Sequence, residues 1–291
     1  MNAALARPLD DLRRLHLQHG PIDLVIEAFG PASEILRAYA QAEECFHQIL
    51  PDLAGQIDIL RRPARPDLAV EGAIAGQMLK AVLPHARSFI TPMAAVAGAV
   101  ADHVLHAMLE GRDLTRAYVN NGGDIALFLS PGTSFRVGIV SNLETAALDG
   151  FAVICAEQPI RGIATSGAGG RSFSLGIADS VTVLAKDAAT ADAAATMIAN
   201  AVDLPGHPAI LRQPAVDLQP DSDLGRLRVT VAVGKLSQEE CRDAVINGLW
   251  RARALVEQGI IEAAKIALRG AVQTIGGGHF LSGRAMSELI G

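Results

Sequence analysis

The stretch that decides the fold runs from Thr91 to Ile139 and reads TPMAAVAGAVADHVLHAMLEG, then RDLTR, then AYVNNGGDIALFLS, then PGTSFRVGI. Thr91 can cap a helix and Pro92 suits its first position, whereas Gly111 can close it. We therefore predict a helix over Pro92–Glu110. Its apolar residues recur at helical spacing, and most of its other positions are alanine or glycine. Another backbone, or a flat ligand, can therefore approach this helix closely.

A glycine-bearing hairpin is expected after this helix. The segment Tyr118–Asn120 and the alternating Ile125, Leu127 and Leu129 have the pattern of two strands. Between them lies Asn120-Asn121-Gly122-Gly123-Asp124, whose asparagines and glycines tolerate positive φ. Such a turn can present backbone N–H groups to an anion or to a ring edge. An ordinary Asn-Gly hairpin has the same spacing and is the commoner case, so spacing alone leaves both interpretations open.

Composition bounds the class of protein. The 291 residues fit about two domain-sized units, or one large domain with an internal duplication. Hydrophobic residues make up 50% and aromatic residues only 4%, so the core must consist of aliphatic side chains in close backbone contact. With a net charge of −6 and no basic stripe interleaved with aromatics, nucleic acid is not expected as a partner.

The chain carries features of a cytoplasmic protein. Its three cysteines, Cys45, Cys155 and Cys241, are far apart and have no paired metal spacing, which is typical of reduced thiols. The first residues lack the apolar run of a signal peptide. The most apolar helix carries Asp102 and is short for a bilayer, so we interpret it as a core helix and expect no membrane partner.

The remaining elements are predicted from periodicity and caps. Residues 1–20 are expected to form a short helix or a loosely held arm, and the proline-rich residues 203–223 a loop. The predicted helices are Ser33–Leu50, ended by Pro51, then Leu68–Val82, Ala191–Val202, capped by Thr190, and a helix to Glu257 that opens with the capping box Ser237–Glu240. The predicted strands are Ile22–Ala28, Arg87–Ile90, Phe135–Val140, Phe151–Ala156, Gly162–Thr165, Phe173–Leu184, Arg226–Val233, Ile260–Leu268 and Ala271–Ile275. Because helices and strands do not alternate strictly, this order predicts an α+β fold with mainly antiparallel sheets and packed helices.

Two places could carry chemistry besides the hairpin. Asp192, Thr196 and Asn200 lie four residues apart, so they would form one row on a helix. Their oxygens would suit Mg²⁺, although a solvated helix face explains the same spacing and is the more frequent outcome. In the predicted strand Phe173–Leu184, Asp179 would share its face with apolar residues, and desolvation would raise its pKa unless it is paired.

Several motifs together, in order and spacing, resemble the FAD:protein FMN transferases (ApbE), and more closely the uncharacterised branch of ApbE-like proteins. They are Gly98 with Asp102, the turn Asn121–Ile125, Ala164–Gly167, and Val181–Val183 followed by Asp192 and Thr196. The resemblance covers roughly residues 65–202. It implies a T-fold-like architecture with two pseudo-repeats, so that residues 1–291 would form one domain with an internal duplication.

The resemblance also implies a site for a flavin nucleotide, FAD or FMN, and for Mg²⁺. Asp192, Thr196 and the carbonyl of Ala97 would bind the metal. The residues that would line the nucleotide are Gly98, Asn121, Gly122, Gly123, Asp124, Thr165 and Ser166.

The sequence departs from the transferases at two motifs. The family's alanine-lysine-glycine reads Val96-Ala97-Gly98 here, so the lysine, a cation near the phosphates, is absent. The family's H-x-x-D-P-x-T-G loop is also absent, with only Asp179 retained at its start.

Three hypotheses follow for the function. The first is a Mg²⁺-dependent flavin or nucleotide transferase or pyrophosphatase, with Asp179 or Asp192 positioning or deprotonating the nucleophile. The second is a flavin- or pterin-binding protein without this chemistry. The third rests on a common feature of T-fold proteins, which bind a purine or pterin ring against a buried acid at a subunit interface. Asp179 would be that acid, and the protein would be a homo-oligomer.

Overall fold

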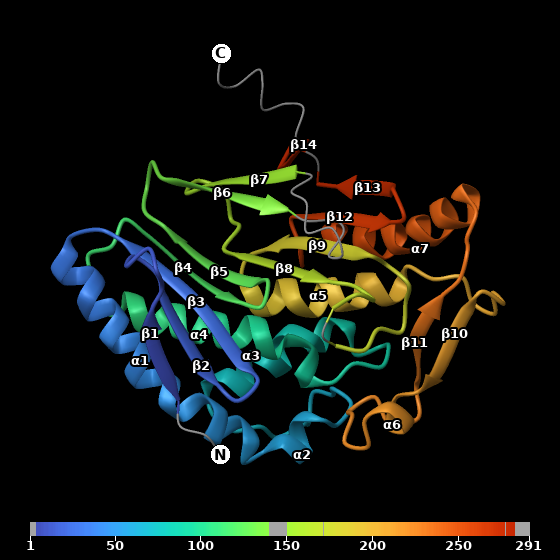
Figure 1. Cartoon of the computed structure of the whole chain (residues 1–291), viewed down its shortest axis with the longest axis horizontal. Coiled ribbons are helices and arrows are strands. Elements are labelled where there is room, and N and C mark those ends of the chain that lie inside the picture. Colours follow the sequence, from blue (N-terminus) through green and yellow to red (C-terminus); the bar gives the residue numbers. More distant parts are fainter. Residues whose placement is uncertain (1–3, 140–149, 171, 277, 283–291) are drawn as a thin grey trace. The chain divides into compact units, whose positions relative to one another are not determined.

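The computed structural model describes residues 4–139, 150–170, 172–276 and 278–282 (Figure 1). The chain divides into two compact units. Unit 1 comprises Met1–Ser134, Cys155–Ala164 and Ala185–Ala193, and unit 2 comprises Phe135–Ile154, Thr165–Leu184 and Ala194–Gly291. Helix α5 (Ala188–Ala201) and strand β8 (Gly162–Ser166) begin in unit 1 and end in unit 2.

Unit 1 is built on an antiparallel sheet. Its strands, in spatial order, are β1 (Leu5–Pro8), β2 (Leu15–His19), β3 (Ile22–Phe29), β4 (Arg116–Asn121), β5 (Asp124–Leu129) and the first part of β8. Alternate residues of β3 are buried, among them Leu24 and Ile26, as expected for a strand with one face on a core.

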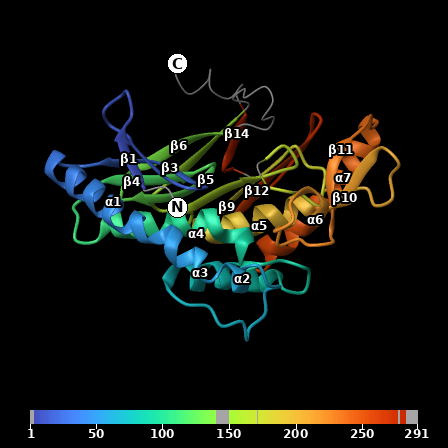
Figure 2. The ribbon, with the colours of Figure 1, turned by 60° about the horizontal axis from the view of Figure 1, so that its bottom comes forward.

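Helices cover one face of this sheet, as Figure 2 shows for α1, α3 and α4. The helices of unit 1 are α1 (Ala32–Ala54), α2 (Ile57–Leu60), α3 (Ala73–Val82) and α4 (Val96–Leu109), with 3₁₀ turns at Leu83–His85 and Pro92–Ala95. Helix α4 packs against α1, α3 and the strands β4 and β5. It therefore occupies the centre of unit 1, next to the hairpin that the sequence predicts as a ligand loop.

Helix α4 confirms the prediction for Pro92–Glu110 with one refinement. Pro92 opens a 3₁₀ turn and the α-helix starts at Val96, whereas the Thr91 side chain, expected as the cap, makes no capping bond. Gly111 follows the helix with a φ of 65°. Among the described residues, Pro92–Leu109 is the segment long and apolar enough to cross a membrane, yet half of it is buried inside the protein, as in a core helix.

Unit 2 holds the remaining elements. They are β6 (Ser134–Ile139), β7 (Gly150–Cys155), β9 (Ser180–Ala185), β10 (Ile210–Pro214), α6 (Ala215–Leu218), β11 (Arg228–Val233), α7 (Gln238–Glu257), β12 (Ala263–Leu268), β13 (Ala271–Ile275) and β14 (Phe280–Ser282). Strands β9, β12 and β13 pair in that order, β10 pairs with β11, and β7 lies between β14 and β6. Helix α7 packs on β12 and β13. Mixed helices and antiparallel sheets confirm the predicted α+β class.

Several element predictions are wrong. Within residues 1–20, the described part forms the hairpin of β1 and β2 instead of a helix or loose arm. Leu15 and Leu17 are buried at every second position, which is the period of a strand. Helix α1 continues through Pro51 to Ala54, where burial of Leu53 holds the last turn.

Other boundaries also differ from the sequence prediction. The expected strand Arg87–Ile90 has no strand structure. The expected loop over residues 203–223 contains β10 and α6, because Pro214 ends the strand and begins the helix without interrupting either. Val140, at the end of the strand predicted over Phe135–Val140, lies outside the described residues.

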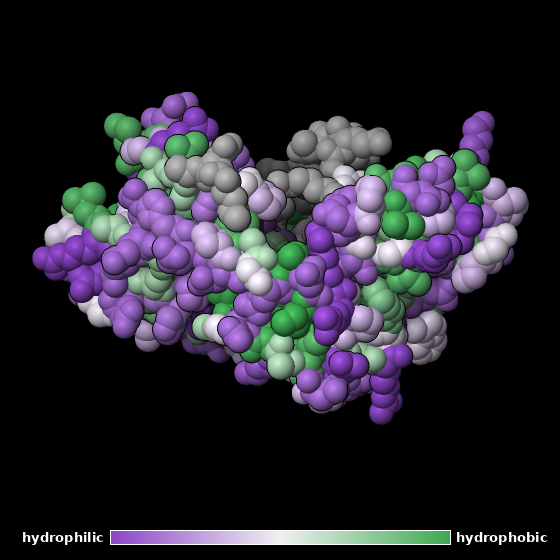
Figure 3. Space-filling model, turned by 90° about the horizontal axis from the view of Figure 1, so that it is seen from below, coloured by the Kyte–Doolittle hydropathy of each residue, from purple (hydrophilic) through white to green (hydrophobic). Residues whose placement is uncertain are grey.

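One face of the molecule is drawn in Figure 3. On this face hydrophilic residues predominate, and hydrophobic residues are grouped in smaller areas between them. The aliphatic side chains that make up much of the sequence are instead buried, with 0% exposure at Val100, Val104 and Met108 of α4.

Candidate functional site

Three segments of unit 1 meet at one point: the start of α4, the start of α5 and the hairpin of β4 and β5. The Gly98 N–H donates to Asp192 Oδ2 at 3.1 Å. The Asn121 Nδ2 donates to the carbonyl oxygen of Ala97, also at 3.1 Å. Ala97, Gly98, Asn121 and Asp192, which the sequence assigns to one site, are therefore direct neighbours.

Gly98 is a glycine because another backbone touches it. A Cβ at this position would lie 2.2 Å from the carbonyl oxygen of Ala188, which is far inside van der Waals contact. Gly162 has the same role on the other side of this segment, since its Cβ would lie 2.0 Å from the carbonyl carbon of Asp187. Of the two approaches that the sequence allows at Gly98, another backbone or a flat ligand, the structure has the backbone.

Asp192 lies among other acids. Burial raises the pKa of Asp192 well above its usual value, and the neighbouring carboxylates of Asp124 and, more weakly, Asp102 raise it further. Hydrogen bonds from the N–H groups of Gly98 and Ala97 act in the opposite direction. The side chain retains some exposure. A cation at this place would relieve the repulsion between the acids, because it favours their charged forms.

The donor atoms at this point are oxygens, which suit a hard cation. The Ala97 carbonyl oxygen accepts from Asn121 Nδ2, and the Asp192 carboxylate accepts the neighbouring Gly98 N–H. Among the residues that the structure describes, no group of three or more His, Cys, Asp or Glu side chains could hold a metal ion. A cation here would therefore take few carboxylates and complete its shell with carbonyl, hydroxyl, water or phosphate oxygens, a donor set that suits Mg²⁺.

The other members of the predicted row on α5 have different surroundings. Thr196 follows Asp192 by one turn of the same helix and is half-buried. Asn200 is engaged within unit 2, where its Oδ1 accepts from the Leu175 N–H at 2.9 Å. The amide of Asn200 thus anchors a neighbouring segment.

The glycine-bearing hairpin is confirmed, and the turn predicted over Asn120–Asp124 narrows to the two residues Gly122 and Gly123. Asn121 pairs with Asp124, and Gly122 and Gly123 have φ values of 65° and 113°. Nothing lies within 4 Å of the position that a Cβ on Gly123 would take. One N–H of the loop is already used, because Gly123 donates to Asn120 Oδ1 at 2.8 Å. The loop is therefore held by its own side chains on one side and open at Gly123.

Thr165 and Ser166 belong to β8, which confirms the strand predicted over Gly162–Thr165 and extends it by one residue. The Thr165 Oγ1 lies 3.0 Å from Thr182 Oγ1 on β9, and both residues are in unit 2. Their hydroxyls link two strands of that unit.

Asp179 does not lie on an apolar strand face. The predicted strand over Phe173–Leu184 is wrong in its first half, since β9 starts only at Ser180 and the preceding residues are irregular. The Asp179 carboxylate accepts the N–H of Arg269, a residue with a positive φ of 48° in the turn between β12 and β13. Asp179 therefore stabilises a turn of unit 2.

Sequence reasoning missed the start of α5. The helix begins at Ala188, and Asp187, not Thr190, caps it by accepting the Thr190 N–H at 2.7 Å. An aspartate directly before an alanine-rich run is a signal for this cap. The carboxylate of Asp102, from α4, accepts the N–H groups of Ala188 and Ala189. No local pattern predicts that contact.

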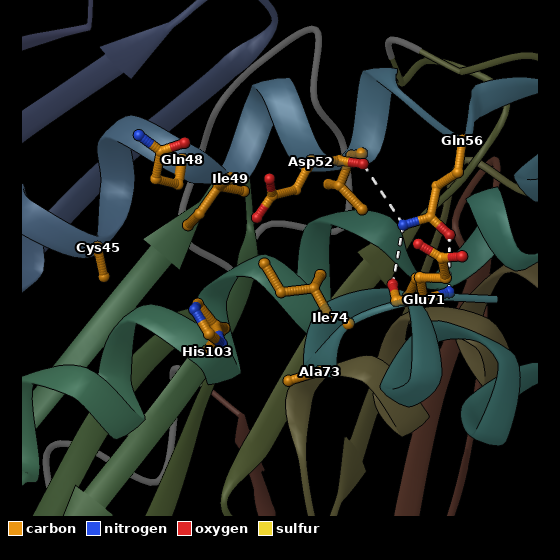
Figure 4. Close-up of a pocket in the computed structure, with 12 residues that line it drawn as sticks. Cys45, Gln48, Ile49, Asp52, Gln56, Glu71, Ala73, Ile74 and His103 are labelled. Carbon is orange, nitrogen blue, oxygen red and sulfur yellow. Dashed lines mark hydrogen bonds between the residues drawn. The ribbon is translucent and has the colours of Figure 1, made fainter.

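A separate cavity of about 80 Å³ lies in unit 1 between α1, the start of α3 and α4 (Figure 4). Gln56 closes one end, since its Nε2 donates to the Glu71 carbonyl at 2.8 Å and its Oε1 accepts the Glu71 N–H at 3.0 Å. Burial raises the pKa of the Cys45 thiol to about 11 and lowers the pKa of His103. A protonated thiol and a neutral imidazole offer no activated nucleophile, and the cavity is too small for a nucleotide.

The chain resembles known proteins at three levels. A family model described as AbpE bacteria matches residues 6–274. A UPF0280 protein of Methanothrix thermoacetophila is 41% identical over 129 residues, which cover 40% of this chain and 49% of the relative. A UPF0280 protein of Methanococcus vannielii is 44% identical over 116 residues, which cover 38% and 45%. The chain thus spans about half the length of these curated relatives.

Solved structures with a related chain path are flavin transferases. A mutant of the ApbE flavin transferase from Vibrio cholerae has a TM-score of 0.48 and 14% identity, covering 90% of this chain and 97% of its own. The apo form of the ApbE flavinyl transferase from Pseudomonas stutzeri has a TM-score of 0.46 and 14% identity, covering 99% and 98%. Because the family model extends over far more than half of the sequence, the chain belongs to the bacterial AbpE family, as the ApbE-like motifs predict.

Proposed function

We propose that the protein binds FAD or a related flavin nucleotide and acts on its pyrophosphate with Mg²⁺, as a transferase or a pyrophosphatase. The observation that carries the proposal is the position of Asp192. This acid lies against the Gly98 N–H, with the carboxylates of Asp124 and Asp102 as electrostatic neighbours. Such a concentration of negative charge favours a bound cation.

In this proposal Asp192 and the Ala97 carbonyl hold Mg²⁺, and Gly98 fixes the Asp192 carboxylate. Bound Mg²⁺ would neutralise the charge of the pyrophosphate. Asn121, Gly122, Gly123 and Asp124 line the nucleotide, which would approach the turn on the side that is open at Gly123. Thr196 as a further metal ligand, and Thr165 and Ser166 as nucleotide contacts, stay predictions from the family resemblance.

Release of AMP from FAD tests this function. Purified protein with FAD and MgCl₂ is expected to release AMP, and EDTA to stop the reaction. Asp192→Asn should lower the rate about 100-fold, in the range seen when one charge-stabilising group is lost. The matched control is Asp58→Asn, which removes an exposed acid of α2 and should leave the rate unchanged. Mg²⁺-independent AMP release, or a fully active Asp192→Asn variant, would contradict the metal role.

A second candidate function is a flavin- or pterin-binding protein without this chemistry. Asp179, the acid expected at the start of the missing loop, is engaged with Arg269, and Ala97 stands where the family's motif has lysine. Micromolar FAD binding by calorimetry, with no AMP formed, would favour this candidate. If Asp179→Asn changes neither AMP release nor affinity, Asp179 has no part in either function.

Location and assembly belong to the same proposal. The three cysteines are free, which fits a reducing compartment such as the cytoplasm. A homo-oligomer is expected only if the ring site uses a subunit interface, and light scattering of the purified protein with and without FAD would decide it.

A further inference from the structure

We propose that Asp102 is a positioning residue: its carboxylate joins α4 to the first turn of α5 and thereby holds Asp192 against Gly98. The inference deepens the proposed function and rests on it for the role of Asp192. The contacts themselves all lie within unit 1 and involve no bound group.

The Asp102 carboxylate accepts three hydrogen bonds from two other helices. Its Oδ1 accepts the Ala188 N–H at 3.0 Å, and its Oδ2 accepts the Ala189 N–H at 2.9 Å. The Oδ2 also accepts from Gln77 Nε2 of α3 at 2.6 Å. The N–H groups in the first turn of a helix have no partner inside the helix, and they carry the positive end of its dipole. A carboxylate is therefore a strong partner for them.

The contacts between α4 and α5 form two rungs. Gly98 binds Asp192 in one rung, and Asp102 binds Ala188 in the other. Each pair of residues on one helix is four positions apart, so both members lie on the same helix face. Gly98 precedes Asp102 on α4, whereas its partner Asp192 follows Ala188 on α5, so the two helices run antiparallel at this contact. If the second rung is lost, the start of α5 can shift, and Asp192 moves with it because it is one turn further along.

No side-chain atom separates the backbones at this point. A Cβ on Gly98 would lie 2.2 Å from the Ala188 carbonyl oxygen, so the first turn of α5 fits against α4 in one register. The close contact at Gly98 keeps the two helices together. The Asp102 carboxylate fixes which N–H groups of α5 face α4, and so sets the orientation of α5.

Other charged groups face Asp102 and set the conditions for a test. Burial raises the pKa of Asp102 to about 7, the charge of Asp187 adds to this effect, and the bonds from Ala188, Ala189 and Gln77 oppose it. Asp192 is a further acid in its electrostatic surroundings. Measurements at pH 8 therefore examine mainly the ionised carboxylate.

Asp187 provides a matched control. It caps the same helix through the Thr190 N–H at 2.7 Å, but it precedes α5 directly in the chain and so does not join the helix to α4. Both Asp102→Ala and Asp187→Ala remove a cap of α5. Only Asp102→Ala removes a rung between the helices.

The first measurement is amide hydrogen exchange on the full chain at pH 8, without added metal or flavin. Asp102→Ala should speed exchange at Ala188 and Ala189, and also at Gly98, whose N–H is protected by Asp192. Asp187→Ala should speed exchange at Thr190 and leave Gly98 unchanged. Unchanged exchange at Gly98 in Asp102→Ala, or equal acceleration in both variants, would overturn the positioning role. Asp102→Asn, which keeps one oxygen as acceptor, should lie between the wild type and Asp102→Ala, and it serves if the alanine variant does not fold.

The second measurement is Mg²⁺ affinity by titration calorimetry in the presence of FAD. Asp102→Ala should weaken Mg²⁺ binding at least tenfold, and Asp187→Ala less than threefold at a similar loss of melting temperature. Equal weakening in both variants would leave Asp102 a structural cap only and overturn the proposal. If the wild-type protein binds no Mg²⁺, the proposed function fails, and the exchange at Gly98 still decides the positioning role.

Discussion

Helices α5 and α7 both begin with satisfied N–H groups, but their partners come from different distances along the chain. Ser237 and Glu240 close a capping box at the start of α7, with bonds of 3.2 Å and 2.6 Å between residues three positions apart. At the start of α5, Asp187 makes one local bond, but Asp102 supplies two more across 86 and 87 positions. The first arrangement uses only residues of the same turn, whereas the second forms only when α4 is packed against α5. The start of α5 is therefore a tertiary feature, and the start of α7 a local one.

The largest expected effect comes from breaking the contact between α4 and α5 at its closest point. Gly98→Ala places a methyl group 2.2 Å from a backbone oxygen, where no side-chain rotation relieves the clash. We expect a loss of about 3 kcal/mol or more in the free energy of unfolding, measured by urea denaturation. The control Gly76→Ala, in α3 with nothing within 4 Å, should be neutral or stabilise by up to about 1 kcal/mol. Equal effects of the two variants would show that the helices can separate without cost.

The pH dependence of stability gives a second, smaller effect at the same helix start. Burial raises the pKa of Asp102 from 3.8 to about 7 in the folded protein. The folded state then holds a proton that the unfolded state releases, so this contribution is complete below pH 4 and is lost as the pH rises through 7. Between pH 5 and 7 the wild type should lose up to about 2 kcal/mol relative to Asp102→Asn, at about 1.4 kcal/mol per pH unit. Parallel stability curves for the two proteins would contradict the shift.

The smallest effect is expected at the local cap of α7. Ser237→Ala should cost about 1 kcal/mol, because it removes one half of the capping box. Ser237→Gly should cost only a few tenths of a kcal/mol. Amide exchange at Gly98 should not change in either variant. A change there would mean that the two helix starts are not independent.

The same contrast explains what the sequence can predict. Three confirmed predictions depend on residues close together in the chain: the capping box of α7, the proline at the start of the central helix and the glycine-bearing hairpin. The prediction of Thr190 as a cap is wrong because Asp187 and Asp102 together satisfy an earlier turn. Asp192 contacts Gly98 although the two residues are 94 positions apart in the chain. Periodicity does not predict such a contact, whereas the resemblance of the motifs to a known family assigned both residues to one site.

Asp179 shows the reverse case. A strand pattern over Phe173–Leu184 places it on an apolar face, but alternation cannot reveal where a strand begins. In the structure β9 starts at Ser180, one residue after Asp179, and the Asp179 carboxylate accepts the N–H of Arg269 in a turn. Sequence patterns predict the contacts of a site residue best when its partners lie within the same helix, strand or turn.

The two-residue loop at Gly122 and Gly123 restricts which changes of length this part of the chain tolerates. Asn121 reaches the Ala97 carbonyl because the loop holds two residues and the strands pair in one register. One inserted residue would have to form a bulge, or it would shift the pairing of β4 with β5 by one residue. Substitutions in the loop can be graded by their φ preference, whereas an insertion or a deletion changes the type of loop. The length of this loop should therefore vary less than the identity of its residues.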